Sequence, residues 1–218
     1  MAKTTEFQGS KFYVGVGLEE AKAITACTIS PNATITAAGH GLVKGDGVKI
    51  TGLGTLDGYY PVENVKNDVV TLSGEVNWAD QDMPTKFADA KVAKIKWSSN
   101  FCEIKSVEGD GDTLSEEDVT TMCSEGTETE PGDIEYGSVK LTFFWSPGDS
   151  EMQKELRKKF FAKETFPYFL ALKKNKGSLL GSGFIQTSPN FSGEVKGKWE
   201  SGVTIKKAKR DYLLPATA

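Results

Sequence analysis

The run AAGHGLVKGDGVKITGLG, residues 37–54, combines closely spaced glycines with Lys44 and with His40, the one histidine of the chain. Such a run could cradle a phosphate or hold an acid–base residue. A P-loop needs GxxxxGK[ST] between a strand and a helix, and a dinucleotide site needs GxGxxG at the start of a helix. Here strand-like sequence follows and the third glycine is absent, so no helix N-terminus is offered to an anion. We therefore interpret the glycines as turn residues with positive φ, and His40 as a turn residue.

The remaining nucleophiles and metal ligands form no recognised catalytic set. The three cysteines are widely spaced and make no CxxC pair, and with a single histidine they do not predict a zinc site: Cys27, Cys102 and Cys123. The sequence has no GxSxG, HExxH or Cys–His arrangement. We therefore predict a protein that is not an enzyme and has no cofactor and no metal.

An acidic segment, EGDGDTLSEED, is a possible calcium loop. Asp110 and Asp112 would take positions 1 and 3 of an EF-hand loop. Positions 5, 6 and 12 would be Leu114, Ser115 and Thr121, where an EF-hand needs an oxygen ligand, a glycine and a glutamate. The mismatch at all three positions argues against calcium.

The formal net charge of −4 conceals two oppositely charged segments. Residues 101–139 hold twelve acids and one base, Lys105, for a net charge of −11. Residues 140–210 hold fifteen bases and six acids, for a net charge of +9. The two segments are either solvated faces of one domain or complementary surfaces of neighbouring copies, since patterned charge sets register between partners.

Short β-prone runs separated by turn residues predict a mainly β (α+β) protein, with two packed antiparallel sheets and one flanking α-helix. Residues 24–80 contain five or six short strands, with a turn at Pro31–Asn32, and we expect them to form a small inserted β-barrel. Residues 1–23 and 81–218 then form the main domain. The sequence has no apolar N-terminal h-region and no apolar run of bilayer length, so we expect neither a secretory signal nor a membrane-spanning segment.

One convincing helix is predicted, from Asp149 to about residue 162, capped by Asp149 or Ser150. Its core face is expected at Met152, Leu156 and Phe160, spaced i, i+4 and i+8. The basic residues are assigned to its other faces: Lys154, Arg157, Lys158 and Lys159. Strands are predicted before it at 135–145 and after it at 166–173, and a closing strand alternates at Val195, Trp199, Val203 and Ile205.

A series of motifs spans this region in a fixed order. These are Asp118-Val119-Thr120-Thr121, Ser124-Glu125-Gly126, Pro131-Gly132, the strand 139–145 and the turn Pro147-Gly148-Asp149 before the helix. With GSKFYVG upstream and GSGFIQTSPNFSGEVKGKWESGVTIK downstream, they resemble the tail tube (major tail) proteins of long-tailed, non-contractile, lambda-like bacteriophages. The resemblance covers residues 1–20 and about 90–212, and residues 24–80 resemble small β-modules of other phage tail and virion proteins.

The resemblance implies a structural virion protein of the phage tail, made and assembled in the host bacterial cytoplasm. Its copies would form hexameric rings that stack head-to-tail into a hollow tube, through which DNA passes without sequence-specific binding. The other implied partners are the tape measure protein, the tail terminator and the distal tail or baseplate proteins.

The resemblance also assigns two groups of site residues. An inter-subunit or ring-stacking loop is implied within 122–134, at Met122, Ser124, Glu125, Thr127, Glu128, Glu130 and Asp133. Acidic residues of the lumen or of the interface would be Glu103, Asp110, Asp112, Glu116, Glu117 and Asp118.

Two other functions remain open from sequence. In the first, the 24–80 insert recognises a host-surface glycan through Tyr59, Tyr60 and Trp78, although packing of these aromatic residues is the simpler reading. In the second, the chain is a small hydrolase, which would require a nucleophile–base pair that the sequence does not offer.

Overall fold

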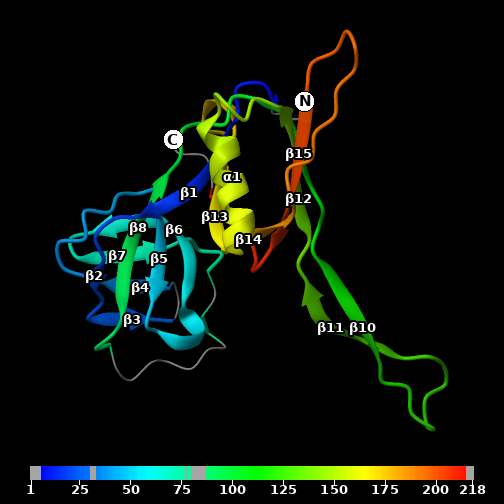
Figure 1. Ribbon diagram of the computed structural model, residues 1–218. Helices are drawn as coiled ribbons and strands as arrows, with labels where there is room; N and C mark the ends of the chain where they lie inside the picture. The colour runs from blue at the N-terminus through cyan, green and yellow to red at the C-terminus, as the bar shows by residue number, and fades with distance from the viewer. Residues whose placement is uncertain (1–5, 30–32, 77, 80–86, 215–218) are drawn as a thin grey trace. The chain divides into compact units, whose positions relative to one another are not determined.

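The computed structural model describes residues 6–29, 33–76, 78–79 and 87–214 (Figure 1). Within them the protein is mainly β, its strand pairs are antiparallel, and the chain has a single α-helix. This confirms the predicted fold class. The turn expected at Pro31–Asn32 lies outside the described residues. No helix in the described ranges is both long and apolar enough to cross a membrane.

The chain divides into two compact units. The first comprises Met1–Cys102, Phe166–Ser182 and Asp211–Ala218, and the second comprises Glu103–Thr165 and Gly183–Arg210. The strands of the first unit are β1 (Lys11–Leu18), β2 (Lys22–Ala23), β3 (Ala26–Thr28), β4 (Thr34–Thr36), β5 (Gly47–Thr51), β6 (Gly58–Lys66), β7 (Val69–Leu72), β8 (Lys91–Trp97), β13 (Phe166–Ala171) and β16 (Tyr212–Leu214). It also holds the 3-10 turns η1 (Gly54–Leu56) and η2 (Lys173–Asn175). Strand β14 (Ser178–Thr187) begins in this unit and ends in the second.

The first unit is built around one apolar core. Its strands follow the order β3-β4-β7-β6-β5-β8-β1-β13-β14, with β2 added to β8 and β16 added to β14. Alternating residues such as Ile35, Val48, Ile50, Val70 and Leu72 are fully buried, as the period-two pattern of half-buried strands requires. The core cluster runs from Ile24 to Val92.

The strands of the predicted insert bond to a strand outside it. Strand β5 pairs with β8, where Lys49 lies opposite Ala93, and β8 in turn pairs with β1. The structural units therefore follow a different division from the predicted boundary at residue 80. That residues 24–80 form an insert stays a prediction.

The second unit contains β9 (Ile104–Gly109), β10 (Thr113–Asp118), β11 (Thr129–Glu135), β12 (Ser138–Phe144), α1 (Glu151–Ala162) and β15 (Glu200–Lys207). Strands β14, β15, β12 and β9 pair in that order, and β10 pairs with β11 in a separate two-stranded sheet. The β12–β15 ladder runs from Ser138 opposite Lys206 to Phe144 opposite Glu200. Val139, Leu141 and Phe143 are buried on one face of β12, which agrees with the strong strand predicted there.

Helix α1 begins and ends close to its predicted limits. The Ser150 hydroxyl accepts a hydrogen bond from the Gln153 amide, so Ser150 is the cap, and Lys163 ends the helix with φ 53°. Met152 and Leu156 are buried as predicted. Phe160 is only half-buried.

The assignment of Lys159 to a helix face away from the core was wrong. Its side chain is buried and lies 3.4 Å from Glu155 and 3.6 Å from Glu164. A long lysine side chain can bury its alkyl stem while its ammonium stays beside carboxylates, so the charge alone did not predict its position.

The predicted alternation of the closing strand holds only in part. Val203 and Ile205 are buried in β15. Val195 and Trp199 precede the strand and are exposed, because β15 begins only at Glu200 and residues 188–199 form a long connection.

Candidate interaction surface

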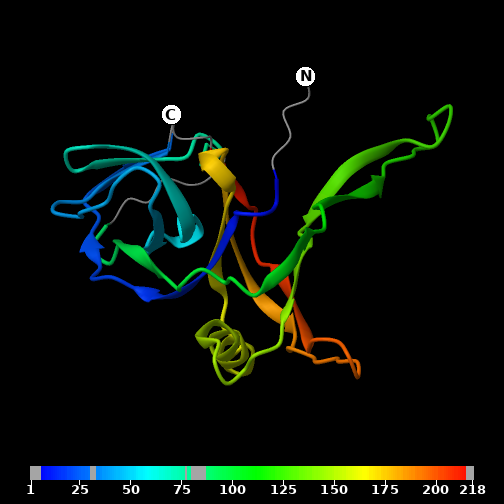
Figure 2. The same cartoon turned by 90° about the horizontal axis from the view of Figure 1, so that it is seen from above.

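The most exposed ordered feature of the second unit is the hairpin formed by β10 and β11. Every residue of β10 is exposed, as is every residue of β11 except the half-buried Gly132. The hairpin extends away from β12 and β15 in both views (Figures 1 and 2). Its tip, residues 119–128, contains the Thr-Thr motif that supports the family resemblance.

One face of this hairpin carries an exposed apolar pair together with Glu116 and Asp118, and the other face carries two opposed glutamates. Leu114 lies opposite Ile134 on one face, and both side chains are more than half exposed. On the other face Glu117 lies directly opposite Glu130. Directly opposed like charges destabilise a strand pair, and an isolated two-stranded hairpin is marginally stable in water. The opposed glutamates therefore reduce the stability of the hairpin when the subunit is alone.

A bulge in β11 sets this register. One residue of β10 lies between Leu114 and Glu116, whereas two residues of β11 lie between their partners Ile134 and Pro131. A Cβ on Gly132 would lie 2.5 Å from the Ser115 hydroxyl oxygen, so a larger residue at this position would require the Ser115 side chain to move.

Hydrogen bonds order the hairpin tip. Asp118 accepts a hydrogen bond from the Thr120 amide at 2.9 Å, and interaction with Thr120 lowers the pKa of the Asp118 carboxyl below its usual value. The Glu128 amide donates to the Thr120 hydroxyl, and the Thr121 amide donates to the Ser124 hydroxyl at 3.0 Å. The motif residues thus build a defined turn and leave the surrounding carboxylates in solvent.

Two aspartates anchor the base of the hairpin to the rest of the second unit. Asp110 accepts a hydrogen bond of 2.6 Å from the Ser138 hydroxyl and lies 3.5 Å from the Lys140 ammonium. The Ser138 hydrogen bond and the Lys140 charge lower the pKa of Asp110.

Asp112 makes the second anchor. Burial raises its pKa, but the hydrogen bonds from the Gly137 amide and the Lys207 ammonium outweigh this effect, and the net pKa is lowered. The two donor–acceptor distances are 2.9 and 3.1 Å. A Cβ on Gly137 would lie 2.3 Å from the Asp110 carbonyl oxygen, so the anchor also depends on this glycine.

The structure brings most of the predicted site residues together, with one correction to their local structure. The segment expected to be a loop is a hairpin, since Glu130 and Asp133 lie in β11 while Met122, Ser124, Glu125, Thr127 and Glu128 lie in its tip. Glu116, Glu117 and Asp118 lie in β10, where the sequence suggested an acidic loop. Asp110 and Asp112 are held by lysines of their own chain, and Glu103 is half-buried ahead of β9.

The glycine-rich run 37–54 forms turns, as predicted. Positive φ values occur at Gly39, Gly41, Gly45, Gly52 and Gly54. His40 Nδ1 accepts from the Leu42 amide at 2.8 Å, which leaves Nε2 to donate to the Asn67 carbonyl at 3.2 Å. Both ring nitrogens of His40 therefore hold the turn.

Two of the three aromatic residues considered for glycan stacking belong to the core. Tyr60 and Trp78 are buried, with ring centroids 5.4 Å apart, and the Tyr60 hydroxyl donates to the Leu56 carbonyl at 2.9 Å. Burial raises the pKa of Tyr60. Tyr59 lies beneath the Lys49 ammonium. The packing reading is confirmed for Tyr60 and Trp78, which cannot present a face to a sugar.

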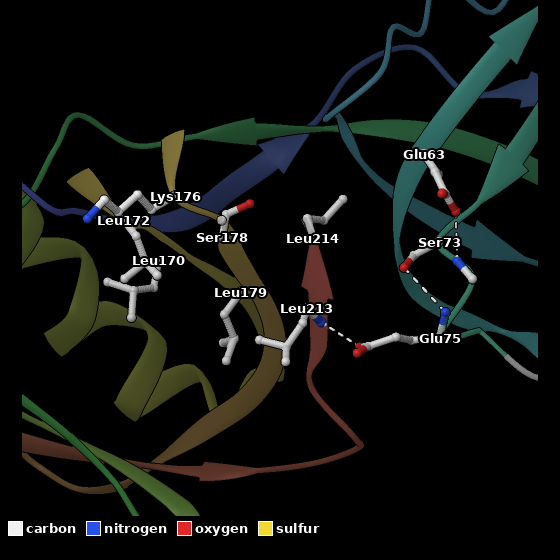
Figure 3. A pocket seen from close by; sticks show the side chains of 12 residues that line it. Glu63, Ser73, Glu75, Leu170, Leu172, Lys176, Ser178, Leu179, Leu213 and Leu214 are labelled. Carbon is white, nitrogen blue, oxygen red and sulfur yellow. Dashed lines mark hydrogen bonds between the residues drawn. The ribbon is translucent and has the colours of Figure 1, made fainter. Parts of the chain in front are cut away.

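A cavity of about 580 Å³ lies within the first unit, between β6, β7, β13, β14 and β16 (Figure 3). Its walls are mainly leucines: Leu170, Leu172, Leu179, Leu213 and Leu214. Its two carboxylates are engaged by the chain, since Glu63 accepts from the Gly74 amide and Glu75 from the Leu213 amide. The cavity therefore lacks the convergent polar groups of a specific ligand site. Among the described residues, no group of three or more His, Cys, Asp or Glu side chains is placed to hold a metal.

Sequence reasoning missed an exposed aromatic cluster in the second unit, formed by Trp145, Phe191 and Trp199. Trp145 stacks on Phe191 at 5.2 Å and lies 5.6 Å from Trp199. Phe191 is 64% exposed and Trp199 is 54% exposed. The three residues follow no helical or strand period, so only the fold gathers them.

Comparison with known proteins gave no match to a family model and no curated relative. Part of the chain is similar to a solved structure of the virion of a native gene transfer agent particle, with a TM-score of 0.44, 16% identity and coverage of 57% of this chain and 89% of that chain. A second similar structure is the tail of an empty gene transfer agent particle with C6 symmetry. Its TM-score is 0.43 and its sequence identity 18%, with coverage of 57% of this chain and 87% of that chain. The SPP1 tail tube is similar with a TM-score of 0.40 and 15% identity, and the match covers 66% of this chain and 74% of that chain.

Proposed function

We propose that this protein is a structural, non-enzymatic subunit of a bacteriophage tail, and that its copies assemble into stacked hexameric rings forming a hollow tail tube. The observation that carries the proposal is the acidic β10–β11 hairpin. It contains the Asp118-to-Thr121 motif of the family resemblance and projects without apolar cover. Such a hairpin gains further stability when a partner covers Leu114 and Ile134 and neutralises its carboxylates.

A free strand edge provides a second contact between copies. Strand β9 pairs with β12 and stands last in the strand order given by the described residues. An uncovered edge offers backbone donors and acceptors to a strand of another chain. Pairing of this kind would join the sheets of neighbouring subunits within a ring.

The proposal assigns a second role to the acidic surface. No lysine or arginine occurs between residues 106 and 139, so carboxylates that face a lumen would repel DNA phosphates and let DNA slide. DNA would pass without sequence-specific binding. The tape measure protein, the tail terminator and the distal tail or baseplate proteins complete the proposed set of partners, in a virion assembled in the host bacterial cytoplasm.

Negative-stain microscopy of the purified full chain tests this function. We expect sixfold rings or long hollow tubes as concentration rises, because identical subunits with complementary ends add head-to-tail without closing. A chain that stays monomeric at high concentration would overturn the proposal.

We further propose that residues 24–80 are an insert that decorates the tube. The family resemblance lies outside this range, and the core cluster of the first unit falls mainly within it. Deletion of 24–80 should leave tubes of reduced stability, because β8 loses its β5 partner. If deletion abolishes every ring and tube while the shortened chain stays folded, the segment belongs to the assembly core.

A further inference from the structure

The exposed aromatic cluster lies at the opposite end of the β12–β15 ladder from the acidic hairpin. The hairpin base is anchored where Ser138 lies opposite Lys206, whereas Trp145 and Trp199 follow and precede the other end, where Phe144 lies opposite Glu200. Seven residues of extended strand separate the two ends by roughly 20 Å. Figure 1 shows the hairpin and the 188–199 connection at opposite ends of this ladder.

The cluster is a preformed surface. The Trp145 amide donates to the Trp199 carbonyl at 2.9 Å, and Ser192 and Glu200 exchange two backbone hydrogen bonds. Gly193 lies against the Trp199 ring, since a Cβ there would come within 2.8 Å of it. Rigid, exposed aromatic residues of this kind are typical anchors of protein interfaces.

Lysines border the cluster, together with Glu194 and with Glu200, which pairs with Lys105. The ammonium groups of Lys105 and Lys198 lie 5.3 and 5.0 Å from the centre of the Phe144 ring, next to Trp145. Lys196 is exposed on the same connection, beside the fully exposed Val195. This surface thus places the exposed Lys196 and Lys198 beside exposed aromatic rings, as the hairpin places carboxylates beside Leu114 and Ile134.

We infer that the Trp145–Phe191–Trp199 cluster is the docking site for the β10–β11 hairpin of a second copy of this chain. Leu114 and Ile134 of the incoming hairpin cover the aromatic rings, and its carboxylates meet Lys196 and Lys198. One copy cannot satisfy both surfaces itself, because they lie at opposite ends of one ladder. The contact is therefore heterologous and propagates from copy to copy. This inference rests on the proposed self-assembly and names the surface that receives the hairpin.

A charge-swap cycle on the full chain tests the contact. One variant carries Glu117→Lys and Glu130→Lys, which keeps a like-charged pair in the hairpin and so leaves its internal repulsion in place. A second variant carries Lys196→Glu and Lys198→Glu, and a third carries all four changes. The critical concentration for assembly is measured for each by sedimentation at low salt.

We expect each two-site variant to raise the critical concentration at least tenfold, and the four-site variant to return it to within a few-fold of the wild type. Contacting residues show such coupling, whereas distant sites give additive effects. Lys44→Glu with Lys66→Glu is the matched control, since it makes the same charge change on exposed lysines of the first unit and should have little effect.

The outcomes separate this inference from the proposed function. Suppose that the wild type assembles, the hairpin variant does not, and the effects of the two pairs of substitutions on the critical concentration simply add in the four-site variant. The hairpin then docks elsewhere and only the inference fails. Assembly of the Phe191→Ala, Trp199→Ala double variant at the wild-type concentration would also overturn it. A wild type that remains monomeric overturns both.

Discussion

Replacing Glu117 by lysine should make the hairpin of the isolated subunit more stable. Glu117 lies directly opposite Glu130, so the substitution removes a repulsion and creates an attraction at the same place. Cross-strand charge pairs contribute about 0.2–1 kcal/mol each way, so the combined change in hairpin opening free energy is about 0.5–2 kcal/mol at low salt. Added salt should reduce this gain, because both side chains are exposed.

Native-state hydrogen exchange on the monomer measures this change. Amides of β10 and β11 should exchange roughly two- to thirty-fold more slowly in Glu117→Lys than in the wild type, since each 1.36 kcal/mol corresponds to a factor of ten. The matched control is Glu125→Lys, which makes the same charge change in the hairpin tip, where Glu125 lies outside both strands. It should leave exchange in the strands nearly unchanged.

The same substitution should weaken assembly although it stabilises the hairpin. Hairpin stability and assembly are expected to change in opposite directions because the carboxylates would bind a partner copy but do not stabilise the fold of the subunit. Equal protection in both lysine variants would show that the opposed pair does not limit hairpin stability. Faster exchange in Glu117→Lys would refute the claim that Glu117 and Glu130 repel each other across the β10–β11 pair.

Three other outcomes follow from single contacts. Asp112→Ala should destabilise the hairpin base by about 1–2 kcal/mol, seen as faster exchange of the Gly137 amide. Because the folded state lowers the pKa of Asp112, its stabilisation is present above the unfolded pKa near 4 and is lost as pH falls through the folded pKa. Acid should therefore speed exchange of the Gly137 amide in the wild type and have no such effect in Asp112→Ala. Leu156→Ala should cost about 2–5 kcal/mol in denaturant unfolding, and a loss below 1 kcal/mol would contradict its full burial. Tyr60→Phe should cost about 0.5–1.5 kcal/mol through the lost hydrogen bond to Leu56 and leave assembly unchanged; impaired assembly with normal stability would count against a core role.

The turns, the helix and the strongest strands could be predicted from sequence because their signals are local. The glycines of 37–54 take positive φ, Ser150 caps α1, and Met152 and Leu156 face the core, as spacing and residue type indicated. The charge of the acidic segment was also read directly from residue identity, and its role in contacts between copies stays a prediction. The structure of this segment was not predicted, since the exposed strands β10 and β11 lack the apolar alternation that marks a half-buried strand.

Other features depended on contacts between distant parts of the chain. Lys159 is buried because Glu155 and Glu164 accompany it, and Tyr60 packs with Trp78 although the sequence also allowed a glycan platform. Burial of such side chains depends on which neighbours the fold supplies, and no local spacing encodes that.

The sequence by itself determined a mainly β chain with one capped helix, turn glycines in place of an anion site, and a strongly acidic segment followed by a basic one. Only the tertiary structure decided that the acidic segment is a hairpin with Glu117 against Glu130, and that Trp145, Phe191 and Trp199 meet at the other end of the β12–β15 ladder. The physical reason is that strand register and long connections bring together residues far apart in the sequence, such as Trp145 and Trp199, which are 54 positions apart. Local propensity acts over a few residues only.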